Sequence, residues 1–409
     1  MKLELKKKKV KKEILSKERN KTMFLSIPYN GDLNLLKISK DRKYPVKTVY
    51  GKRFQDIIGG GRARYDIANY GEDNLKEAIK LTHEMGAEFN YLFNAPCSAN
   101  TEIEKENEII KEISFLIEEY KIDIITVANP RLLKLIRKHF PKIRLSVSTI
   151  AKVDSLEKVL EYEKAGATEI TLDYNIYRNF EELKRIRKNS KLGFQLIAND
   201  GYLFNCPWAT YHFQLEGHDS QNTYNNPLKY FSYCRFNCKQ KSAKEPYELI
   251  RGMWIRPEDM HYYEEIGLNK FKIIDRLKDT EWLINAIEAY VNRTYKGNLS
   301  DIICSFDTFK KDSIKTPRIK DEDITANNIQ NLRKFWDLKP YIDNEKLTEL
   351  NFLEFFIKNK LDCRNKVCKN CNYCKQIADK AIIVDKENAE NVVYNLDFIK
   401  EKLIDIVKE

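Results

Sequence analysis

The feature that most constrains the fold is an alternation of short β-rich runs with amphipathic helical segments along residues 21–295. The β-rich runs occupy residues 23–29, 46–52, 87–94, 122–129, 143–149, 169–175, 192–199 and 270–276. A parallel pair of strands needs a long crossover between them, which is usually a helix. Eight such units in succession favour a closed (β/α)8 barrel, so the sequence predicts a TIM-like α/β fold.

Helix-end signals agree with this pattern. Pro130 stands at a first helical position, where its missing N–H costs nothing. Gly86 and Gly166 follow amphipathic runs and are expected to end those helices. Asp154 or Ser155 is the expected N-cap of the second run.

Three segments depart from the alternation. Residues 1–20 form a basic leader, expected to be a solvated arm or an arm that contacts RNA. A cysteine-bearing loop at 201–257 interrupts the predicted barrel of 21–295, and a connection of that length is expected to be functional or folded around something. Residues 296–409 are predicted to be a mainly helical C-terminal extension with a four-cysteine cluster.

The predicted strands end in polar residues, which in a barrel of this type lie at the end that carries the chemistry. These are Asn30, Asn94, Asn129, Ser148, Asp173, Asn175, Asn199 and Asp275. Each is also a common turn former or helix cap, which is the simpler interpretation of any one of them. From this set we expect Asp275, Asp173 and Asn199 to position the substrate, with Arg276 neutralising its acid groups.

Composition limits the class of protein. With 42% hydrophobic residues the chain has enough apolar material for a core, which excludes global disorder. No apolar run reaches the about 18–20 residues of a membrane span, and the first residues lack the apolar part of a secretory signal. A net charge of +11 suits a polyanion such as RNA, although lysines spread along the whole chain also fit a simple compositional bias. We expect a cytoplasmic protein with reduced cysteines.

Four of the nine cysteines lie close together near the C-terminus. Cys363, Cys368, Cys371 and Cys374 have the spacing Cys-x4-Cys-x2-Cys-x2-Cys. Clustered thiolates in a reducing compartment usually hold metal, and four of them suit a [4Fe–4S] cluster or zinc. Their close packing is more like a ferredoxin loop than a zinc ribbon, although Cys-x4-Cys at the start is not the ferredoxin spacing.

A second group lies in the 201–257 segment, where Cys206 is followed by Cys234 and Cys238. Three thiolates are one short of the set that holds a [4Fe–4S] cluster. Cys97, at the end of another predicted strand, is favoured as the fourth ligand because both loops share one rim of the barrel. Other candidates are Cys304, His212 or His218, an open iron position, or no metal and three buried structural thiols.

Other motifs are less specific. The run Gly-Gly-Gly-Arg-Ala-Arg at 59–64 is typical of an anion cradle or of a flexible loop. Arg62, Arg256 and Arg276 could clamp a dicarboxylate. Basic and aromatic residues alternate in residues 229–241, as in a surface that stacks on RNA bases or an apolar jacket around a cluster. The chain has no His-Glu-x-x-His and no Gly-x-Ser-x-Gly motif.

Two segments of the sequence resemble the peptidase U32 family. The resemblance rests on YELIRGMWIRPEDMHYYEEIGLNKFKIIDR at 247–276 and on GYLFNCPW at 201–208 with its downstream cysteines. Cys206, Cys234 and Cys238 match the family's cluster loop, while Lys272, Asp275 and Arg276 match its last-strand motif. The cysteine spacing differs from that of better-known members, and Ile274-Asp275-Arg276 stands where the family commonly has Glu-Gly-Arg.

The resemblance implies a TIM-like barrel with a [4Fe–4S] cluster at its mouth and an oxygen-independent hydroxylation of RNA bases or a quinone precursor. It also implies a prephenate-like dicarboxylate as oxygen donor. We expect an enzyme that modifies RNA, an electron donor as partner, and a homo- or hetero-oligomer. The alternatives are a peptidase of the U32 type and a non-catalytic, zinc-binding, RNA-associated protein.

Overall fold

The computed structural model describes residues 23–64, 69–221, 234–304, 316–320, 335, 338 and 340–408. The predicted basic leader at 1–20 lies outside the described residues, as do residues 229–233 of the predicted aromatic and basic run. None of the described helices has the length and apolar character required to cross a membrane.

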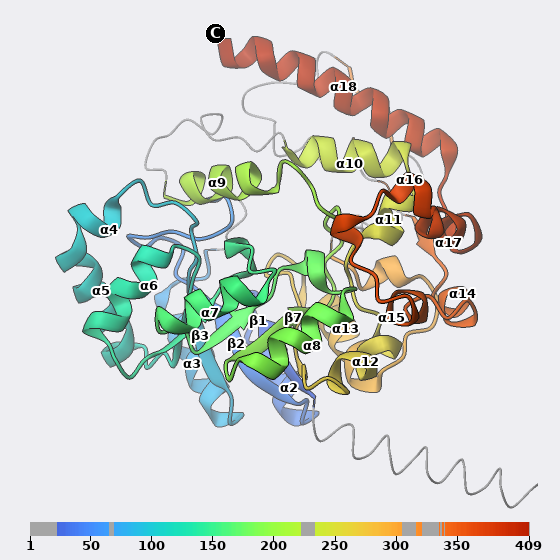
Figure 1. Cartoon of the computed structure of the whole chain (residues 1–409). Coiled ribbons are helices and arrows are strands. Elements are labelled where there is room, and N and C mark those ends of the chain that lie inside the picture. Colours follow the sequence, from blue (N-terminus) through green and yellow to red (C-terminus); the bar gives the residue numbers. More distant parts are fainter. Residues whose placement is uncertain are drawn as a thin grey trace, which may run out of the picture.

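Eight parallel strands form a closed barrel in the order β1 to β8, which confirms the predicted fold class (Figure 1). The strands are β1 Phe24–Pro28, β2 Val46–Gly51, β3 Glu88–Phe93, β4 Ile124–Val127, β5 Arg144–Val147, β6 Glu169–Thr171, β7 Gly193–Ile197 and β8 Lys270–Lys272. The ring closes where Phe24 of β1 pairs with Lys270 of β8. All eight lie within the predicted runs.

Helices cover the outside of the barrel. They are α2 Leu33–Asp41, α3 Glu72–Glu84, α4 Thr101–Glu104, α5 Glu106–Glu119, α6 Pro130–His139, α7 Leu156–Lys164, α8 Phe180–Asn189, α12 Met260–Glu264 and α13 Thr280–Asn292. Pro130 is the first residue of α6, and Ser155 caps α7 by accepting a hydrogen bond from the Lys158 amide. Alternate strand residues such as Leu25, Phe89 and Val127 are fully buried and belong to the main hydrophobic core.

The interior of the barrel is unusually polar. The Thr126 hydroxyl donates to Oδ1 of Asn90 at 2.8 Å, and the Gln195 amide donates to the Thr171 hydroxyl at 2.9 Å. Toward the C-terminal end, Tyr50, Leu92, Ile197 and Ile274 form a small separate apolar cluster. The barrel is therefore filled by side chains and is not a channel.

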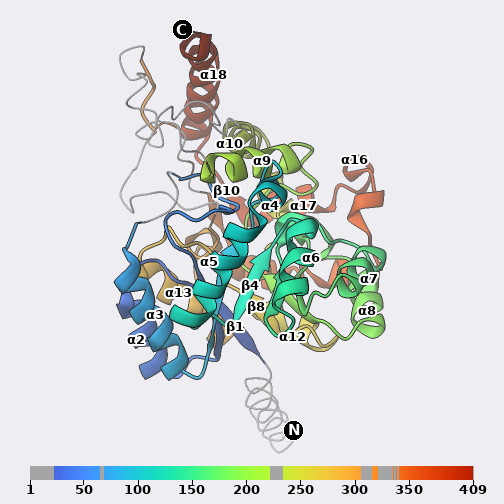
Figure 2. The same ribbon diagram turned by 90° about the vertical axis from the view of Figure 1, so that its left-hand side faces the viewer.

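Three helices occur in the segment predicted as a long loop. They are α9 Ala209–Ser220, α10 Cys234–Lys244 and α11 Tyr247–Arg251. Figures 1 and 2 both show α9 and α10 lying across one end of the barrel.

The C-terminal extension is mainly helical, as predicted. It contains β9 Tyr341–Ile342, α14 Asn344–Glu349, α15 Glu354–Lys358, η8 Cys363–Asn365, α16 Cys368–Cys371, α17 Tyr373–Ala381, β10 Ile382–Ile383 and α18 Lys386–Lys408. Phe352 and Phe356 belong to the same hydrophobic core as the barrel, so the extension packs directly on it. Helix α18 packs on α10, where Val392 and Leu396 meet Phe236 (Figure 2).

Candidate active site

The C-terminal end of β8 carries Asp275, and Asn199 fixes the backbone there. Asn199 is fully buried; its Nδ2 donates to the carbonyl of Ile274 at 2.6 Å and to that of Ile302 at 3.2 Å. Its Oδ1 accepts a hydrogen bond from the Ile274 amide at 2.8 Å. The side-chain amide is thus used inside the protein, and Asn199 positions the segment that leads into Asp275.

Asp275 is held as an anion. Nη1 of Arg62 lies 2.8 Å from its Oδ2, and the Leu277 amide donates to its Oδ1 at 3.1 Å. Burial opposes ionisation, but Arg62 and the amide outweigh it, so the pKa of Asp275 lies below its usual value. The Cys304 thiol also points to Oδ2, at 3.5 Å.

Two more cations lie at this end of the barrel. Nζ of Lys272 lies 3.9 Å from the centroid of the Tyr50 ring. Burial and then the nearby Arg276 charge lower the pKa of Lys272 to about 7. Burial and then Arg62 likewise lower the pKa of Arg276. Positive charges that repel one another in a buried site favour binding of an anion. A bound anion offsets both the repulsion between the cations and their loss of solvation.

The glycine run that carries Arg62 is clamped by α9. The amide of Gly60 donates to Ser220 Oγ at 2.9 Å, that of Ala63 to Glu216 Oε2 at 2.7 Å and that of Arg64 to Asp219 Oδ2 at 2.7 Å. A Cβ added at Gly61 would lie 2.1 Å from Cδ1 of Ile150, so a side chain there would clash. These three amides are already occupied by side-chain oxygens, which argues against the predicted anion cradle. The loop serves instead to present Arg62 to Asp275.

Arg256, the third arginine of the predicted clamp, lies elsewhere. It is 3% exposed and makes a bidentate pair with Asp259, both contacts at 2.7 Å. Its Nη1 also donates to the Asn344 carbonyl and the Thr348 hydroxyl, so it joins the barrel to α14.

The structure brings Cys206, Cys234 and Cys238 together. The Cys238 thiol hydrogen-bonds to Cys206, which is the main reason that the pKa of Cys206 is lowered to about 6. Burial, and then the Cys206 thiolate, raise the pKa of Cys234 to about 11. The same hydrogen bond, followed by burial, raises the pKa of Cys238. Cys206 and the segment 234–238 therefore contribute their thiols to one group of sulfurs, which we call the barrel group.

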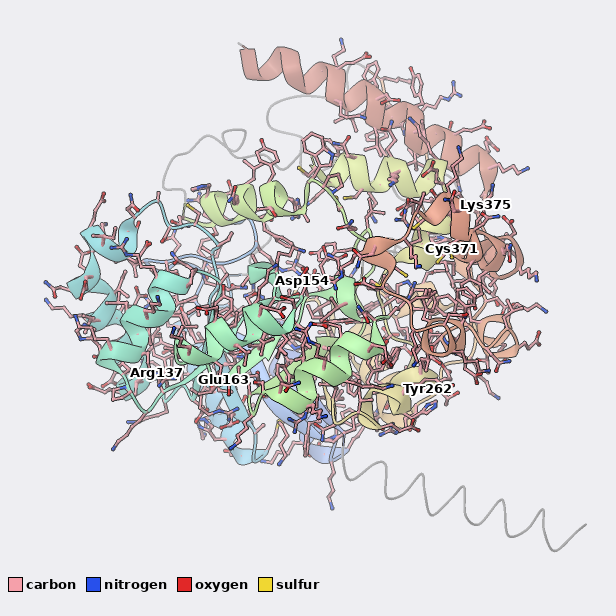
Figure 3. The ribbon with its side chains drawn as sticks, viewed as in Figure 1. Arg137, Asp154, Glu163, Tyr262, Cys371 and Lys375 are labelled. Carbon is pink, nitrogen blue, oxygen red and sulfur yellow. The ribbon has the colours of Figure 1, made fainter. Side chains whose placement is uncertain are left out.

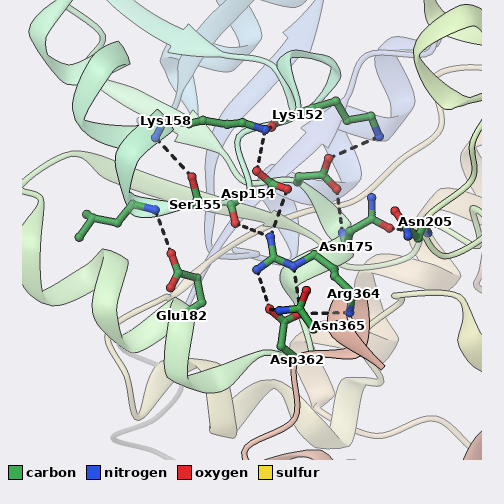
Figure 4. A network of polar contacts seen from close by, with 12 residues as sticks. Lys152, Asp154, Ser155, Lys158, Asn175, Glu182, Asn205, Asp362, Arg364 and Asn365 are labelled. Carbon is green, nitrogen blue, oxygen red and sulfur yellow. Dashed lines mark hydrogen bonds and ion pairs between the residues drawn. The ribbon is translucent and has the colours of Figure 1, made fainter. Parts of the chain in front are cut away.

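A polar network fixes the chain next to Cys206 (Figure 4). Asp173 Oδ1 accepts from the Asn175 amide at 2.8 Å, and Asn175 Oδ1 in turn accepts from the Asn205 amide at 2.7 Å. Nζ of Lys152 lies 3.5 Å from Asp173 Oδ2, and its charge is a further reason for the lowered pKa of Cys206. Asp173 therefore caps the turn after β6 and orients the cysteine segment.

Three of the candidates for a fourth ligand make contacts with other groups. The Cys97 carbonyl accepts from Gln221 Nε2 at 2.8 Å, Cys304 lies against Asp275, and His212 Nε2 lies 3.8 Å from Glu216. Across the described residues, no three His, Cys, Asp or Glu side chains are arranged as they would be around a metal ion. The donor set nevertheless fits a thiolate-bound group, because the three sulfurs are neighbours beside a buried lysine.

Two residues that help to build the site, Lys152 and Glu216, were not predicted from the sequence. Lys152 follows β5, so the strand-end rule could have found it, but lysines are spread along the whole chain and it did not stand out. Glu216 is 1% exposed and joins Ala63 to Arg235, beside Cys234. Nothing in its local pattern marks it, because its two partners come from distant segments.

Residues 55–202 match the family model described as Peptidase family U32. The chain is thus similar to this family over a little more than a third of its length. The U32 segment contains Arg62, Cys97, Lys152, Asp173 and Asn199, and it ends just before Cys206.

Two proteins similar to the chain are named for different activities, one as a protease and one for tRNA hydroxylation. Over 363 residues it is 28% identical to "Uncharacterized protease MJ1657" of Methanocaldococcus jannaschii, covering 88% of this chain and 96% of that protein. Over 137 residues it is 26% identical to "tRNA hydroxylation protein P" of Escherichia coli, covering 32% of this chain and 28% of that protein. The solved structure of "the U32 Peptidase Mk0906" is 18% identical and covers 62% of this chain and 92% of its own, with a TM-score of 0.45.

Proposed function

We propose that the chain is an iron–sulfur enzyme that modifies RNA by an oxygen-independent redox or hydroxyl-transfer reaction at the barrel mouth. Its oxygen donor would be a dicarboxylate of the prephenate type. The sulfurs of Cys206, Cys234 and Cys238 would hold a [4Fe–4S] cluster, with Cys97 as the expected fourth ligand.

One observation carries this proposal: the sulfur group and the cationic group share one end of the barrel. Lys152, whose charge acts on Cys206, bonds to the Tyr174 hydroxyl at 3.0 Å. The Tyr174 ring lies 5.6 Å from that of Tyr202. Burial, and then Asp200, raise the pKa of Tyr202, which also senses the charges of Arg62 and Asp275. Contacts and charge interactions together therefore link the thiols to the Arg62–Asp275 pair.

The cationic group supplies the acid-binding part of the reaction. Arg62, Lys272 and Arg276 would neutralise two carboxylates, and Asp275 would orient the donor and accept or return a proton. A cluster, when bound, would supply one-electron chemistry. Asn199 and Asp173 act as positioning residues, because both are used within the protein.

An exposed aromatic pair beside Cys206 favours an RNA substrate. Trp208 is 47% exposed and Tyr211 is 40% exposed, with their ring centroids 6.5 Å apart. Unpaired bases stack on such rings, at about 1–3 kcal/mol per base. The net charge of +11 and the relatives named for tRNA hydroxylation point the same way.

The test measures modified nucleosides in cells whose chromosomal copy of the gene has been deleted. These cells carry either no gene, the wild-type gene or a variant gene on a plasmid. We expect the wild-type chain to restore a nucleoside one oxygen atom heavier, detected by mass spectrometry of total tRNA and rRNA. Asp275→Asn and Cys206→Ala should not restore it. Lys184→Gln, on the exposed face of α8, should restore it fully. Restoration by Asp275→Asn would contradict the proposal.

The peptidase alternative makes a different prediction. Two of the five histidines are paired with groups that include no cysteine or serine: His83 bonds to Asp123, and His261 to the Glu258 carbonyl. Cleavage of peptides by the metal-free chain, abolished by Cys206→Ala, would support a peptidase and overturn the proposed function.

A further inference from the structure

The cysteines of the extension form a second sulfur group, separate from that at the barrel mouth. Cys363 begins η8, Cys368 and Cys371 are the two ends of α16, and Cys374 lies in the first turn of α17. Figure 3 shows Cys371 at the outer side of the molecule, away from the barrel axis. Four thiols thus follow one another through three consecutive short elements.

The same elements are anchored at both ends, to the barrel on one side and to the rest of the extension on the other. Arg364 of η8 donates to the Asp154 carbonyl at 2.9 Å and pairs with Asp362 at 2.8 Å (Figure 4). Tyr373 of α17 stacks on Phe355 at 3.7 Å between ring centroids, and its hydroxyl donates to the Phe352 carbonyl at 2.9 Å. The cysteines are therefore carried by a backbone that is fixed before any ligand binds.

The thiols are neighbours in space. Burial raises the pKa of Cys374 to about 11, and the charges of Cys363 and Cys368 raise it further. Burial also raises the pKa of Cys363 to about 11, with added effects from Cys368 and Cys371. Cys363 and Cys374 also pack against the same hydrophobic core, and the two ends of α16 lie between them in the chain.

Two buried guanidinium groups face this sulfur group with unused hydrogen-bond donors. Arg178 is 2% exposed, and its two terminal nitrogens donate to the carbonyls of Ile250 at 2.8 Å and Gly252 at 2.5 Å. Its Nε, although buried, has no hydrogen-bond partner among the described residues, and the same is true of the Nε of Arg251. Both arginine charges act on Cys374. A buried donor without an acceptor is costly, so this site lacks an anionic acceptor.

We propose that Cys363, Cys368, Cys371 and Cys374 hold an iron–sulfur cluster of their own, with Arg178 and Arg251 as its charge-compensating neighbours. Four thiolates on a metal centre carry net negative charge, and cluster sulfurs accept hydrogen bonds. Iron is favoured over zinc because three of the cysteines follow one another at Cys-x2-Cys-x2-Cys, whereas structural zinc sites usually combine two separated pairs. Metal binding itself would close the ligand set, since such sites seldom exist preformed without the ion.

This centre lies beside the barrel thiols across α11. Lys241, whose charge acts on Cys206, pairs with Glu248 at 2.9 Å, and Glu248 pairs with Arg251 at 2.5 Å. Arg251 also lies over the Phe204 ring at 5.4 Å, two residues before Cys206. The two sulfur groups are thus neighbours joined by one line of ion pairs.

The test is the metal content of the full chain purified without air. Iron, acid-labile sulfide and zinc would be quantified in the wild type, Cys371→Ala, Cys206→Ala and the matched control Lys369→Ala, which alters the same short helix. We expect Cys371→Ala to lose about four irons and four sulfides relative to wild type, and Lys369→Ala to lose none. Because Cys371 is exposed, its loss should not unfold the chain, which circular dichroism would check.

The proposal stands independently of the barrel cluster. If Cys206→Ala retains all its iron while Cys371→Ala loses it, the proposed function fails and this inference holds. Loss of zinc instead of iron from Cys371→Ala would overturn the iron–sulfur assignment. Unchanged iron and zinc in a folded Cys371→Ala would overturn the site.

Discussion

The two sulfur groups of this molecule are built in opposite ways. The barrel group depends on long-range contacts, since Asn175 fixes the segment next to Cys206 and Glu216 holds Arg235, beside Cys234. The extension group is carried by consecutive turns between Cys363 and Cys374. A ligand set built locally can be inferred from spacing, whereas a set assembled by tertiary contacts cannot be completed from the sequence.

The groups also differ in electrostatics. The pKa of Cys206 is lowered to about 6, mainly by the hydrogen bond from Cys238, whereas burial raises that of Cys374 to about 11. The barrel group therefore contains a thiolate at neutral pH even without metal, whereas Cys363 and Cys374 of the extension group favour the neutral thiol until a metal binds.

The largest expected effect is in thiol reactivity. In metal-free protein at pH 7, Cys206 should react with iodoacetamide about a hundredfold faster than Cys374, because its larger thiolate fraction outweighs its lower intrinsic nucleophilicity. Peptide mass spectrometry after timed alkylation would measure both rates. Lys152→Met should shift the Cys206 profile to higher pH. Equal rates at the two positions would remove the contrast between the groups.

The second effect concerns the contacts that assemble the barrel group. Glu216→Gln removes a buried charge that binds Arg235 and the Ala63 amide, so we expect a loss of about 2 kcal/mol of unfolding free energy. Urea denaturation would measure it. Glu181→Gln, at an exposed pair on α8, is the control and should change stability by less than about 0.5 kcal/mol. Equal losses would mean that Glu216 is not a tertiary anchor.

The third effect is a pH dependence of anion binding at the barrel mouth. With a pKa of about 7, Lys272 is protonated below pH 7 and neutral above it. Affinity for succinate should therefore fall as pH rises from 6 to 8, by about fivefold if the bound anion raises the pKa of Lys272 by about one unit. Lys272→Met should bind weakly at both pH values. Calorimetry that shows an unchanged affinity across this range would exclude Lys272 from the site.

The smallest effect is expected in the extension. Arg364→Ala removes contacts to Asp154 and Asp362, but the side chain is 23% exposed and solvent screens the pairs. We expect a loss of at most about 1 kcal/mol in the same urea experiment, with the cysteine turns still in place. A loss larger than that of Glu216→Gln would reverse the comparison between the two groups.

The barrel itself was predictable because its signal is local. Each strand is a short apolar run with a helix after it, and helix-start residues such as the N-cap Ser155 and the first helical residue Pro130 act within a few residues. The segment 201–257 was predicted as a loop, yet it contains α9, α10 and α11. The polar residues Glu216 and Asp219 of α9 are buried against the glycine loop, so the helix lacks the usual apolar face.

The candidate site was predictable in part. Cys206, Cys234 and Cys238 do meet, and Asp275 does lie beside an arginine. Asn199 and Asp173, expected to touch the substrate, instead hold the backbone around the site. From sequence spacing alone, a polar side chain that faces the barrel mouth looks the same as one that hydrogen-bonds to the backbone around it. The difference depends on where the carbonyls and amides of other segments lie in the fold.

The most direct test of the central claim is the iron and sulfide content of Cys206→Ala, purified without air beside the wild type. This variant is expected to lose about four irons and the matching sulfide, together with the RNA modification, while its circular dichroism stays that of the wild type. A folded Cys206→Ala protein that keeps its full iron and sulfide would contradict it.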